Sequence, residues 1–207
     1  MKKRCFINLI CAYMMTSLHT NFTPFPVLKT DRLTLRKIDF EDIDAMFELR
    51  SDKKNMEFLD RPLAKDRNDA KALIVKIEDA LLMNTGITWA VTLNGADKAL
   101  IGTIGYWRMD AENHRAEIGY ILHRNYHRKG LMHEAMQAVI DYGFETMNLH
   151  SIEANVNPVN EASINLLLKS NFVKEALFKE NYYFEGRFLD SAIYSLITSK
   201  KQKGTNS

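Results

Sequence analysis

Cysteine is scarce in this sequence of 207 residues, where Cys5 and Cys11 are the only two and both stand near the N-terminus. The rest of the chain therefore has no disulfide framework and no cysteine metal site. Such usage is typical of a reducing compartment, so we expect a cytoplasmic protein. The histidines His123, His127 and His133 are close in sequence but lack the HExxH arrangement and nearby cysteines, so we expect no metal.

The sequence also lacks an excess of charge of either sign. Lysine and arginine number 28 against 26 acidic residues, which gives a net charge of +2. A dedicated nucleic-acid binder usually carries a strongly basic face, so we expect no nucleic-acid partner. Long apolar runs are missing too. The stretch at residues 5–15 is interrupted by Asn8 and is shorter than the roughly 20 residues of a transmembrane helix, so we expect no membrane partner.

Residues 1–26 need a separate interpretation. Basic residues before an apolar stretch have the outline of a short signal peptide, yet no small-x-small cleavage site follows. We expect a poorly ordered or loosely packed extension, with export as the alternative. Because Pro24 and Pro26 break regular structure, we expect the domain to cover residues 27–198, followed by a basic, solvated tail at 199–207.

Hydrophobic periodicity predicts one domain in which strands and helices share a single sheet. Residues 151–157 alternate between apolar and polar, as a half-buried strand does, whereas Met132, Met136 and Val139 share one face of a helix. The expected order is strand, two helices, three strands, helix, strand, helix and two strands, which is an α+β or mixed α/β domain. The expected strands are 33–36, 87–93, 100–108, 116–122, 151–157, 173–183 and 187–197, and the helices begin near Asp39, Asp69, Leu131 and Glu161.

The stretch HRNYHRKGLMHEA, residues 123–135, places basic residues and one glycine directly before an apolar helical pattern. A helix N-terminus has unpaired N–H groups and a partial positive charge, so it suits an anion such as phosphate. Gly130 lets the backbone approach an anion closely, and Arg128 and Lys129 add formal charge. Neither the P-loop pattern nor the dinucleotide-binding glycine pattern occurs, and a solvated basic turn is the alternative.

The segment AEIGYILHRNYHRKGLMHEAMQAVIDYGFETMNLHSIEANVNPVNEASINLLLKSNFVKEALFKENYYFEGRFLDSAIYSLI resembles the GNAT acetyltransferase superfamily. The resemblance extends from about Val27 to Thr198 and includes the typical opening LKTDRLTLRKIDFEDIDAMFELRSD. The most similar branch is that of the Rim-type ribosomal-protein N-terminal acetyltransferases, with spermidine acetyltransferases as near neighbours. The resemblance implies a single GNAT-like domain whose central, mostly antiparallel sheet has splayed strands and is flanked by helices.

The same resemblance implies acetyl-CoA as the co-substrate. In the family a loop of the form Q/R-x-x-G-x-G/A holds the pyrophosphate through its backbone N–H groups. Residues 127–132 keep the glycine but have His at the first position and Met in place of the last small residue. The strand end at residues 120–122 is implied to run beside the pantetheine arm. The implied cofactor-binding residues are Tyr120, Ile121, Leu122, His127, Arg128, Lys129, Gly130, Leu131, Met132, Asn160 and Ser163.

A later family motif, N-x-x-A/S with tyrosine four residues on in many members, is matched in part. Asn160 and Ser163 fit it, the tyrosine position holds Leu167, and the family's Gly-Phe pair reads Asn171-Phe172. We expect Asn160 to bind the pantetheine amide and also to cap its helix. Many relatives protonate the departing sulfur with the missing tyrosine, so Ser163 is expected to take a modest catalytic role. Alternatively, Ser163 is only a small residue that makes room for the cofactor.

Acetyl transfer requires a neutral amine. At pH 7 an α-amine is about one-tenth neutral and a lysine is neutral about once in 2,500 molecules, so a base helps. The resemblance makes Glu117 the candidate base, directly or through a water; its alternative is a strand carboxylate paired with Arg108 or Arg115. A backbone N–H near Leu122 is the implied oxyanion donor. Candidate residues for the acceptor pocket, or else for packing, are Trp89, Trp107, Tyr182 and Tyr183.

We therefore expect an acetyl-CoA-dependent N-acetyltransferase that moves the acetyl group to a primary amine by direct attack in a ternary complex. The amine acceptor is the expected partner, with a protein N-terminus as one candidate, and the chain is expected to be a monomer or a homodimer. Alternatives are a polyamine or other small-amine acetyltransferase, or a non-catalytic acyl-CoA sensor. The sensor alternative rests on the altered positions Met132, Leu167 and Asn171.

Overall fold

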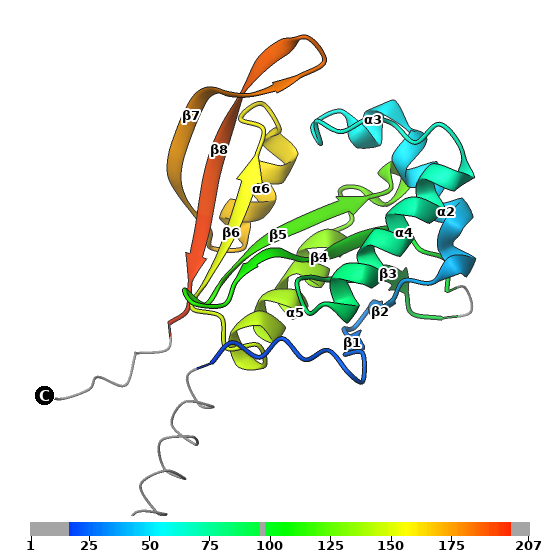
Figure 1. Cartoon of the computed structure of the whole chain (residues 1–207), viewed down its shortest axis with the longest axis horizontal. Helices are drawn as coiled ribbons and strands as arrows, with labels where there is room; N and C mark the ends of the chain where they lie inside the picture. The colour runs from blue at the N-terminus through cyan, green and yellow to red at the C-terminus, as the bar shows by residue number, and fades with distance from the viewer. Residues whose placement is uncertain (1–16, 96–97, 200–207) are drawn as a thin grey trace, which may run out of the picture.

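The computed structural model describes residues 17–95 and 98–199, which form one sheet with helices on both faces (Figure 1). The eight strands of this described part lie in the order β1-β2-β3-β4-β5-β6-β8-β7. All neighbouring strands are antiparallel except β5 and β6, which are parallel. The expected single α+β domain with a mostly antiparallel sheet is confirmed.

The helices and strands have the following bounds. The strands are β1 (Leu28–Lys29), β2 (Leu33–Lys37), β3 (Ile87–Leu93), β4 (Gly102–Asp110), β5 (Arg115–Leu122), β6 (Ser151–Val156), β7 (Val173–Phe184) and β8 (Arg187–Ile197). The helices are η1 (Phe40–Asp42), α2 (Ile43–Ser51), α3 (Lys53–Met56), α4 (Arg67–Leu82), η2 (Arg124–Tyr126), α5 (Leu131–Glu145) and α6 (Glu161–Lys169), where η marks 3-10 helices.

The expected elements are all present, and the differences lie at their ends. The helix expected near Asp69 is α4, which begins earlier because the Asp66 carboxylate caps it, accepting the N–H groups of Asn68 and Asp69 at 2.8 and 3.2 Å. The short elements β1 and α3 were not predicted, since two and four residues are too few for a periodic pattern.

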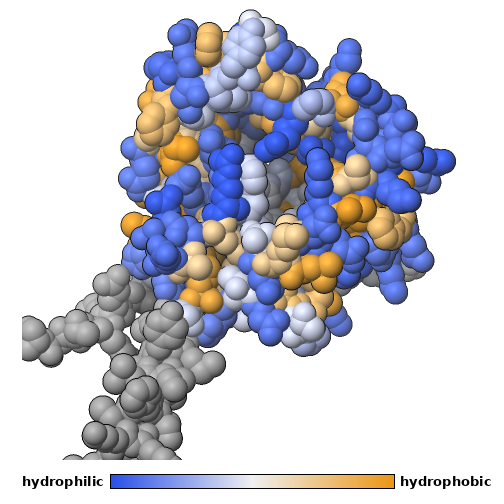
Figure 2. Space-filling model, viewed as in Figure 1, coloured by the Kyte–Doolittle hydropathy of each residue, from blue (hydrophilic) through white to orange (hydrophobic). Residues whose placement is uncertain are grey.

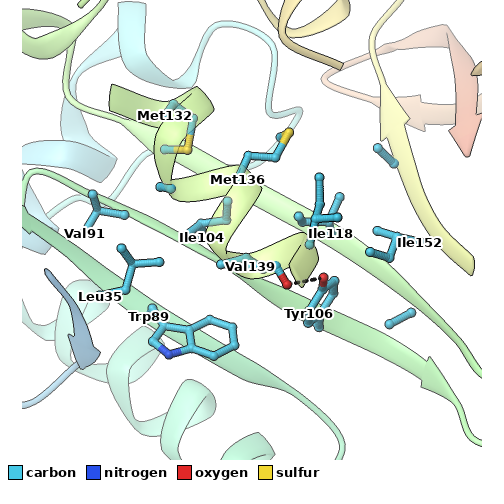
Figure 3. Packing of buried hydrophobic residues seen from close by; sticks show 14 of the residues in the cluster. Leu35, Trp89, Val91, Ile104, Tyr106, Ile118, Met132, Met136, Val139 and Ile152 are labelled. Atoms are coloured by element: carbon cyan, nitrogen blue, oxygen red, sulfur yellow. Dashed lines mark hydrogen bonds between the residues drawn. The ribbon is translucent and has the colours of Figure 1, made fainter. Parts of the chain in front are cut away.

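Two apolar layers cover the two faces of the sheet. The larger layer packs α5 against the strands and includes Trp89, Ile104, Met136 and Val139 (Figure 3). Tyr106 crosses this layer, and its hydroxyl donates a hydrogen bond of 2.8 Å to the Val139 carbonyl. The second layer, under α2 and α4, is built from Ile38, Met46, Leu49, Met56, Ala70, Ile74, Ala90, Leu100 and Ile121. The sheet is therefore buried on both sides, which holds β4 and β5 rigidly between the two layers.

The packed domain begins before residue 27, which corrects the expected boundary. Phe22 is buried in the larger apolar layer, and the His19 N–H donates to the Met147 carbonyl at 2.8 Å. An apolar residue that joins the core anchors this segment, so residues 17–26 are part of the domain. The rest of the expected extension and almost all of the expected tail lie outside the described residues. In the described part, every helix is too short or too polar to cross a membrane.

Candidate active site

Strands β5 and β6 pair over only three residues and then separate. Residues 115–117 of β5 are in register with 151–153 of β6, whereas β5 continues to pair with β4 as far as Leu122. β6 pairs with β8 along its whole length, and beyond residue 117 β5 and β6 spread apart into a V (Figure 1). The expected splayed strands are confirmed, and residues 118–122 have one edge that no strand of the described residues covers.

The backbone at the end of β5 directs a hydrogen-bond donor toward this open edge. The His123 N–H donates to Ile101 next to β4 at 2.8 Å. Because successive N–H groups of an extended strand point to opposite edges, the Leu122 N–H points toward the gap. The Leu122 carbonyl has a partner, since His127 Nε2 donates to it at 2.8 Å. The side chain of His127 thus holds the strand end in place.

The loop between β5 and α5 leaves the N-terminus of α5 without a side-chain cap. Gly130 is the N-cap residue and has the left-handed backbone (φ 74°) that glycine adopts without strain. Among the described residues, no side chain caps the N–H groups of the first turn, so these N–H groups are available to an anion. Met132 packs into the core (Figure 3), so its bulk, where the family has a small residue, does not fill the loop.

A distant segment fixes the position of this loop. Arg32 donates through Nη1 to the Lys129 carbonyl at 2.9 Å and through Nε to Glu134 at 2.6 Å. The other Glu134 oxygen accepts the Thr30 hydroxyl at 2.5 Å. Burial raises the pKa of Glu134, but the hydrogen bonds from Thr30 and Arg32 outweigh it and leave the pKa below its ordinary value. Sequence reasoning missed Arg32 and Glu134, because no local pattern relates residues so far apart.

Glu117 lies where β5 and β6 begin to separate, and its side chain is only 9% exposed. Burial raises its pKa, while Arg108, whose Nη1 is 3.2 Å from Oε2, opposes the rise and nearby Glu153 adds to it. A carboxylate with a raised pKa is a better proton acceptor near neutral pH. The pairing with Arg108, which is the alternative to the base role, is present, whereas Arg115 pairs with Glu153 at 2.7 Å.

The start of α6 brings the two matched motif residues together. Asn160 caps the helix as expected, since its Oδ1 accepts the Ser163 N–H at 3.0 Å. The Ser163 hydroxyl lies 2.6 Å from the Tyr120 hydroxyl, which arrives from β5. Burial raises the pKa of Tyr120 to about 12, more than the hydrogen bond with Ser163 lowers it, so the phenol keeps its proton at neutral pH. This contact between two hydroxyl groups was not predicted.

Two further residues depart from the family pattern, Leu167 and Asn171, and both fit their surroundings in the C-terminal part of α6 and the turn after it. Leu167 is fully buried in the apolar core. Asn171 has a left-handed backbone (φ 64°), and asparagine tolerates that conformation better than other residues with a side chain. The N–H groups of Phe172 and Asn171 donate to the carbonyls of Leu167 and Leu168, which is a Schellman motif that normally uses glycine. Asn171 therefore replaces the family glycine without loss of the turn.

The acceptor side of the gap is lined by polar and aromatic groups. Trp107 stands opposite Glu117 on β4, with the guanidinium groups of Arg108 and Arg61 at 4.4 and 5.4 Å from its ring centre. The Tyr182 hydroxyl donates to the Asp60 carboxylate, which joins the β7–β8 hairpin to the segment after α3. Figure 2 shows a hollow on this face, with hydrophilic residues around it.

Two of the four aromatic residues expected at the acceptor side lie elsewhere. Trp89 is fully buried in the core, where its indole N–H donates to the Pro26 carbonyl at 2.7 Å. Tyr183 is 63% exposed and contacts Phe188 at 5.1 Å on the hairpin. The strand period explains both outcomes, because neighbouring residues of a strand face opposite sides.

The three histidines of the basic stretch do not converge on one point. His127 contacts the Leu122 carbonyl, His133 Nδ1 lies 3.2 Å from the Ser170 hydroxyl, and His123 lies 3.2 Å from Glu48. Within residues 17–95 and 98–199, no group of three His, Cys, Asp or Glu side chains is arranged to hold a metal ion.

Comparison with known proteins agrees with this geometry. The model of the acetyltransferase (GNAT) domain matches residues 32–173. The uncharacterized N-acetyltransferase p20 of Bacillus licheniformis is 39% identical over 170 residues, which cover 82% of this chain and 95% of that protein. The ribosomal protein uS5-alanine N-acetyltransferase of Escherichia coli is 32% identical over 103 residues, 49% of this chain and 53% of that protein. The structure of spermidine N-acetyltransferase from Vibrio cholerae in complex with CoA and spermine has a TM-score of 0.72 at 23% identity, covering 83% of this chain and 98% of that one.

Proposed function

The chain belongs to the GNAT acetyltransferase family and is an N-acyltransferase, and on that premise we propose that it acetylates the N-terminal amine of a peptide or protein. The relative from Escherichia coli is named as an alanine N-acetyltransferase of ribosomal protein uS5, which supports a protein as the acceptor. Physical chemistry supports it as well, because an α-amine has a far larger neutral fraction at pH 7 than a lysine or polyamine nitrogen. Acetyl-CoA supplies the activated acetyl group when it is bound.

The co-substrate fits the residues that surround the gap. The uncapped first turn of α5 and the left-handed Gly130 suit a pyrophosphate, and Arg128 and Lys129 add positive charge beside it. The open edge of residues 120–122 offers backbone groups to the amides of the pantetheine arm, as one more strand would. Asn160 Oδ1 accepts the Ser163 N–H that caps α6, and its amide nitrogen is the group that can donate to that arm.

Glu117 receives the proton of the incoming amine, directly or through one water. It is buried, its pKa is raised, and it lies at the point where β5 and β6 begin to separate. Arg108 favours the ionised form of this carboxylate by donating a hydrogen bond to it and by its positive charge, both of which lower its pKa. The Leu122 N–H then stabilises the negative charge that develops on the attacked carbonyl oxygen.

Ser163 donates a hydrogen bond to the departing thiolate, and Tyr120 acts as a positioning residue. A thiol of pKa about 8.5 leaves as the thiolate without great difficulty and takes its proton from water afterwards, so the missing tyrosine acid is not essential. If the phenol of Tyr120 donates to Ser163 Oγ, the serine proton is free to point into the gap. The pair thus stabilises the departing sulfur by a hydrogen bond, where the tyrosine that Leu167 replaces would protonate it.

The separation of β5 and β6 beside buried Glu117 is the observation that carries this proposal. The test is acetyl-CoA turnover, detected as free thiol, with a panel of amines that contains amidated peptides, free amino acids and spermidine. We expect turnover with peptides whose N-terminal amine is free and none with the same peptides acetylated at that amine. Binding of acetyl-CoA without turnover of any amine would favour the acyl-CoA sensor, and turnover restricted to spermidine would favour the polyamine enzyme.

A further inference from the structure

Arg50, at the end of α2, is a half-buried cation without an anionic partner. In residues 17–95 and 98–199 its guanidinium has neither an ion pair nor a hydrogen bond, and the charge that acts on it is that of Arg61. Burial lowers the pKa of Arg50, and Arg61 lowers it further. Removing a guanidinium from water without a partner is unfavourable, so this side chain is suited to receive an anion.

The Arg50 side chain lines a pocket of about 300 Å³ between α2, residues 62–65 and α4. We name it the Arg50 pocket. The other charged residues of its wall are Lys65 and Asp69. The Asp69 carboxylate already accepts the Lys65 N–H at 2.8 Å, and it is not near enough to Arg50 to form an ion pair. The net charge of the pocket wall is therefore positive. The guanidinium group of Arg50 is the hydrogen-bond donor that remains available to a ligand.

The Arg50 pocket lies close to the entrance of the acceptor side. The same short segment that forms its wall contributes Asp60, which contacts Tyr182 of the hairpin, and Arg61, which stacks over Trp107 opposite Glu117. Arg61 acts electrostatically on both Glu117 and Arg50. Since one residue of extended chain spans about 3.5 Å, residues 62–64 lie within roughly 10 Å of Arg61 along the chain.

We propose, building on the proposed function, that the Arg50 pocket binds a carboxylate that the acceptor carries within a few residues of its reacting amine. Arg61 guides this carboxylate past Trp107, and Arg50 receives it in a forked hydrogen bond. The carboxylate has two possible sources, an acidic side chain near a peptide N-terminus or the acid group of a small amino compound. A polyamine suits this entrance poorly, because it would bring several positive charges toward Arg50 and Arg61.

The test compares amidated peptides of the form Ala-Ala-X-X-Ala, in which X is glutamate, glutamine or lysine. Amidation removes the terminal carboxylate, so the glutamate and glutamine peptides differ only in the charge of X, and the lysine peptide reverses that charge; acetylation is assigned to the N-terminal amine by mass spectrometry. We expect the ratio of kcat/KM for the glutamate peptide to that for the glutamine peptide to be about tenfold or more, the scale of a hydrogen bond between charged groups. Free glutamate against glutamine, and spermidine, are measured in parallel to separate the possible sources of the carboxylate.

Two variants assign this preference to the Arg50 pocket. Arg50→Met keeps most of the side-chain volume and removes the charge, and Arg61→Gln removes the outer charge at an exposed site that folding tolerates. Both are expected to lower the glutamate-to-glutamine ratio severalfold or more, mainly through KM. Lys76→Met is the matched control, because it removes one positive charge from an exposed position of α4 that does not line the pocket, and its ratio should equal that of the unmodified protein. Direct binding of the same peptides is measured by calorimetry in the presence of CoA.

The possible results distinguish this inference from the proposed function. Equal turnover of glutamate, glutamine and lysine peptides overturns the inference and leaves peptide acetylation standing. A glutamate preference that Arg50→Met and Arg61→Gln both retain also overturns it. Peptide binding that depends on Arg50, without turnover, supports the Arg50 pocket and overturns peptide acetylation. Turnover of free glutamate that depends on Arg50, with no peptide turnover, assigns the carboxylate to a small acceptor. Preference for spermidine overturns both proposals.

Discussion

The contact between Tyr120 and Ser163 predicts how two substitutions combine. The hydroxyl groups lie 2.6 Å apart and belong to β5 and α6, which meet beside the gap. A hydrogen bond between neutral groups contributes about 0.5–1.5 kcal/mol, and each 1.4 kcal/mol is tenfold in rate. Ser163→Ala is therefore expected to lower kcat about tenfold. Tyr120→Phe is expected to lower kcat somewhat less, because the serine loses the hydroxyl that orients it but keeps its own hydroxyl group.

The double variant carries the stronger test. If Tyr120 acts only through Ser163, Tyr120→Phe should have little further effect once Ser163 is alanine, and the double variant should match Ser163→Ala. Two independent residues would instead multiply their effects, to almost a hundredfold loss. Ser163→Thr, which keeps a hydroxyl, is the conservative control and should retain most of the activity.

The assay separates catalysis from binding and folding. Turnover is followed as free thiol at saturating acetyl-CoA, affinity for acetyl-CoA is measured by calorimetry, and stability is measured by urea denaturation. A kcat effect with unchanged affinity and cooperative unfolding supports the role of Ser163 as hydrogen-bond donor to the departing thiolate. Full activity of Ser163→Ala, multiplicative effects in the double variant, or loss of all activity in Tyr182→Phe while acetyl-CoA still binds would each refute the reasoning.

Three further predictions concern the base and the anion site. Glu117→Gln should lower kcat roughly 10²–10⁴-fold at constant acetyl-CoA affinity, and near-normal activity from pH 6 to 9 would make Glu117 structural. Arg108→Gln removes a charge that lowers the pKa of Glu117, so that pKa should rise and the acid limb of the kcat–pH profile should move to higher pH; an unmoved or lowered limb contradicts the pairing. Gly130→Asp should weaken acetyl-CoA binding about tenfold more than Gly130→Asn. Both side chains tolerate the left-handed backbone of this position, but only the aspartate carries a negative charge that repels phosphate. Equal affinities measured by calorimetry would exclude a phosphate at this loop.

The elements themselves were determined by the sequence. Strand β3 occupies Ile87–Leu93 and α5 begins at Leu131, as the periodicity of these segments predicts. These features depend on residues within one or two turns of each other, so a local pattern is enough to identify them. Gly130 before an apolar helix likewise predicted the proposed anion site, because a helix N-terminus and a left-handed residue are both local features.

Only the tertiary structure decided which side chains meet. Glu117 forms its ion pair with Arg108, and Arg115 pairs with Glu153 instead. Tyr120 contacts Ser163, 43 positions away in the sequence, and Arg32 hydrogen-bonds to Glu134, 102 positions away. The unpartnered Arg50 is visible only once its neighbours are known. Periodicity assigns a residue to a face of its own element, but the order of strands and the packing of α5 and α6 determine what lies opposite that face. Those depend on the burial of the whole apolar surface at once, and no short stretch of this sequence encodes them.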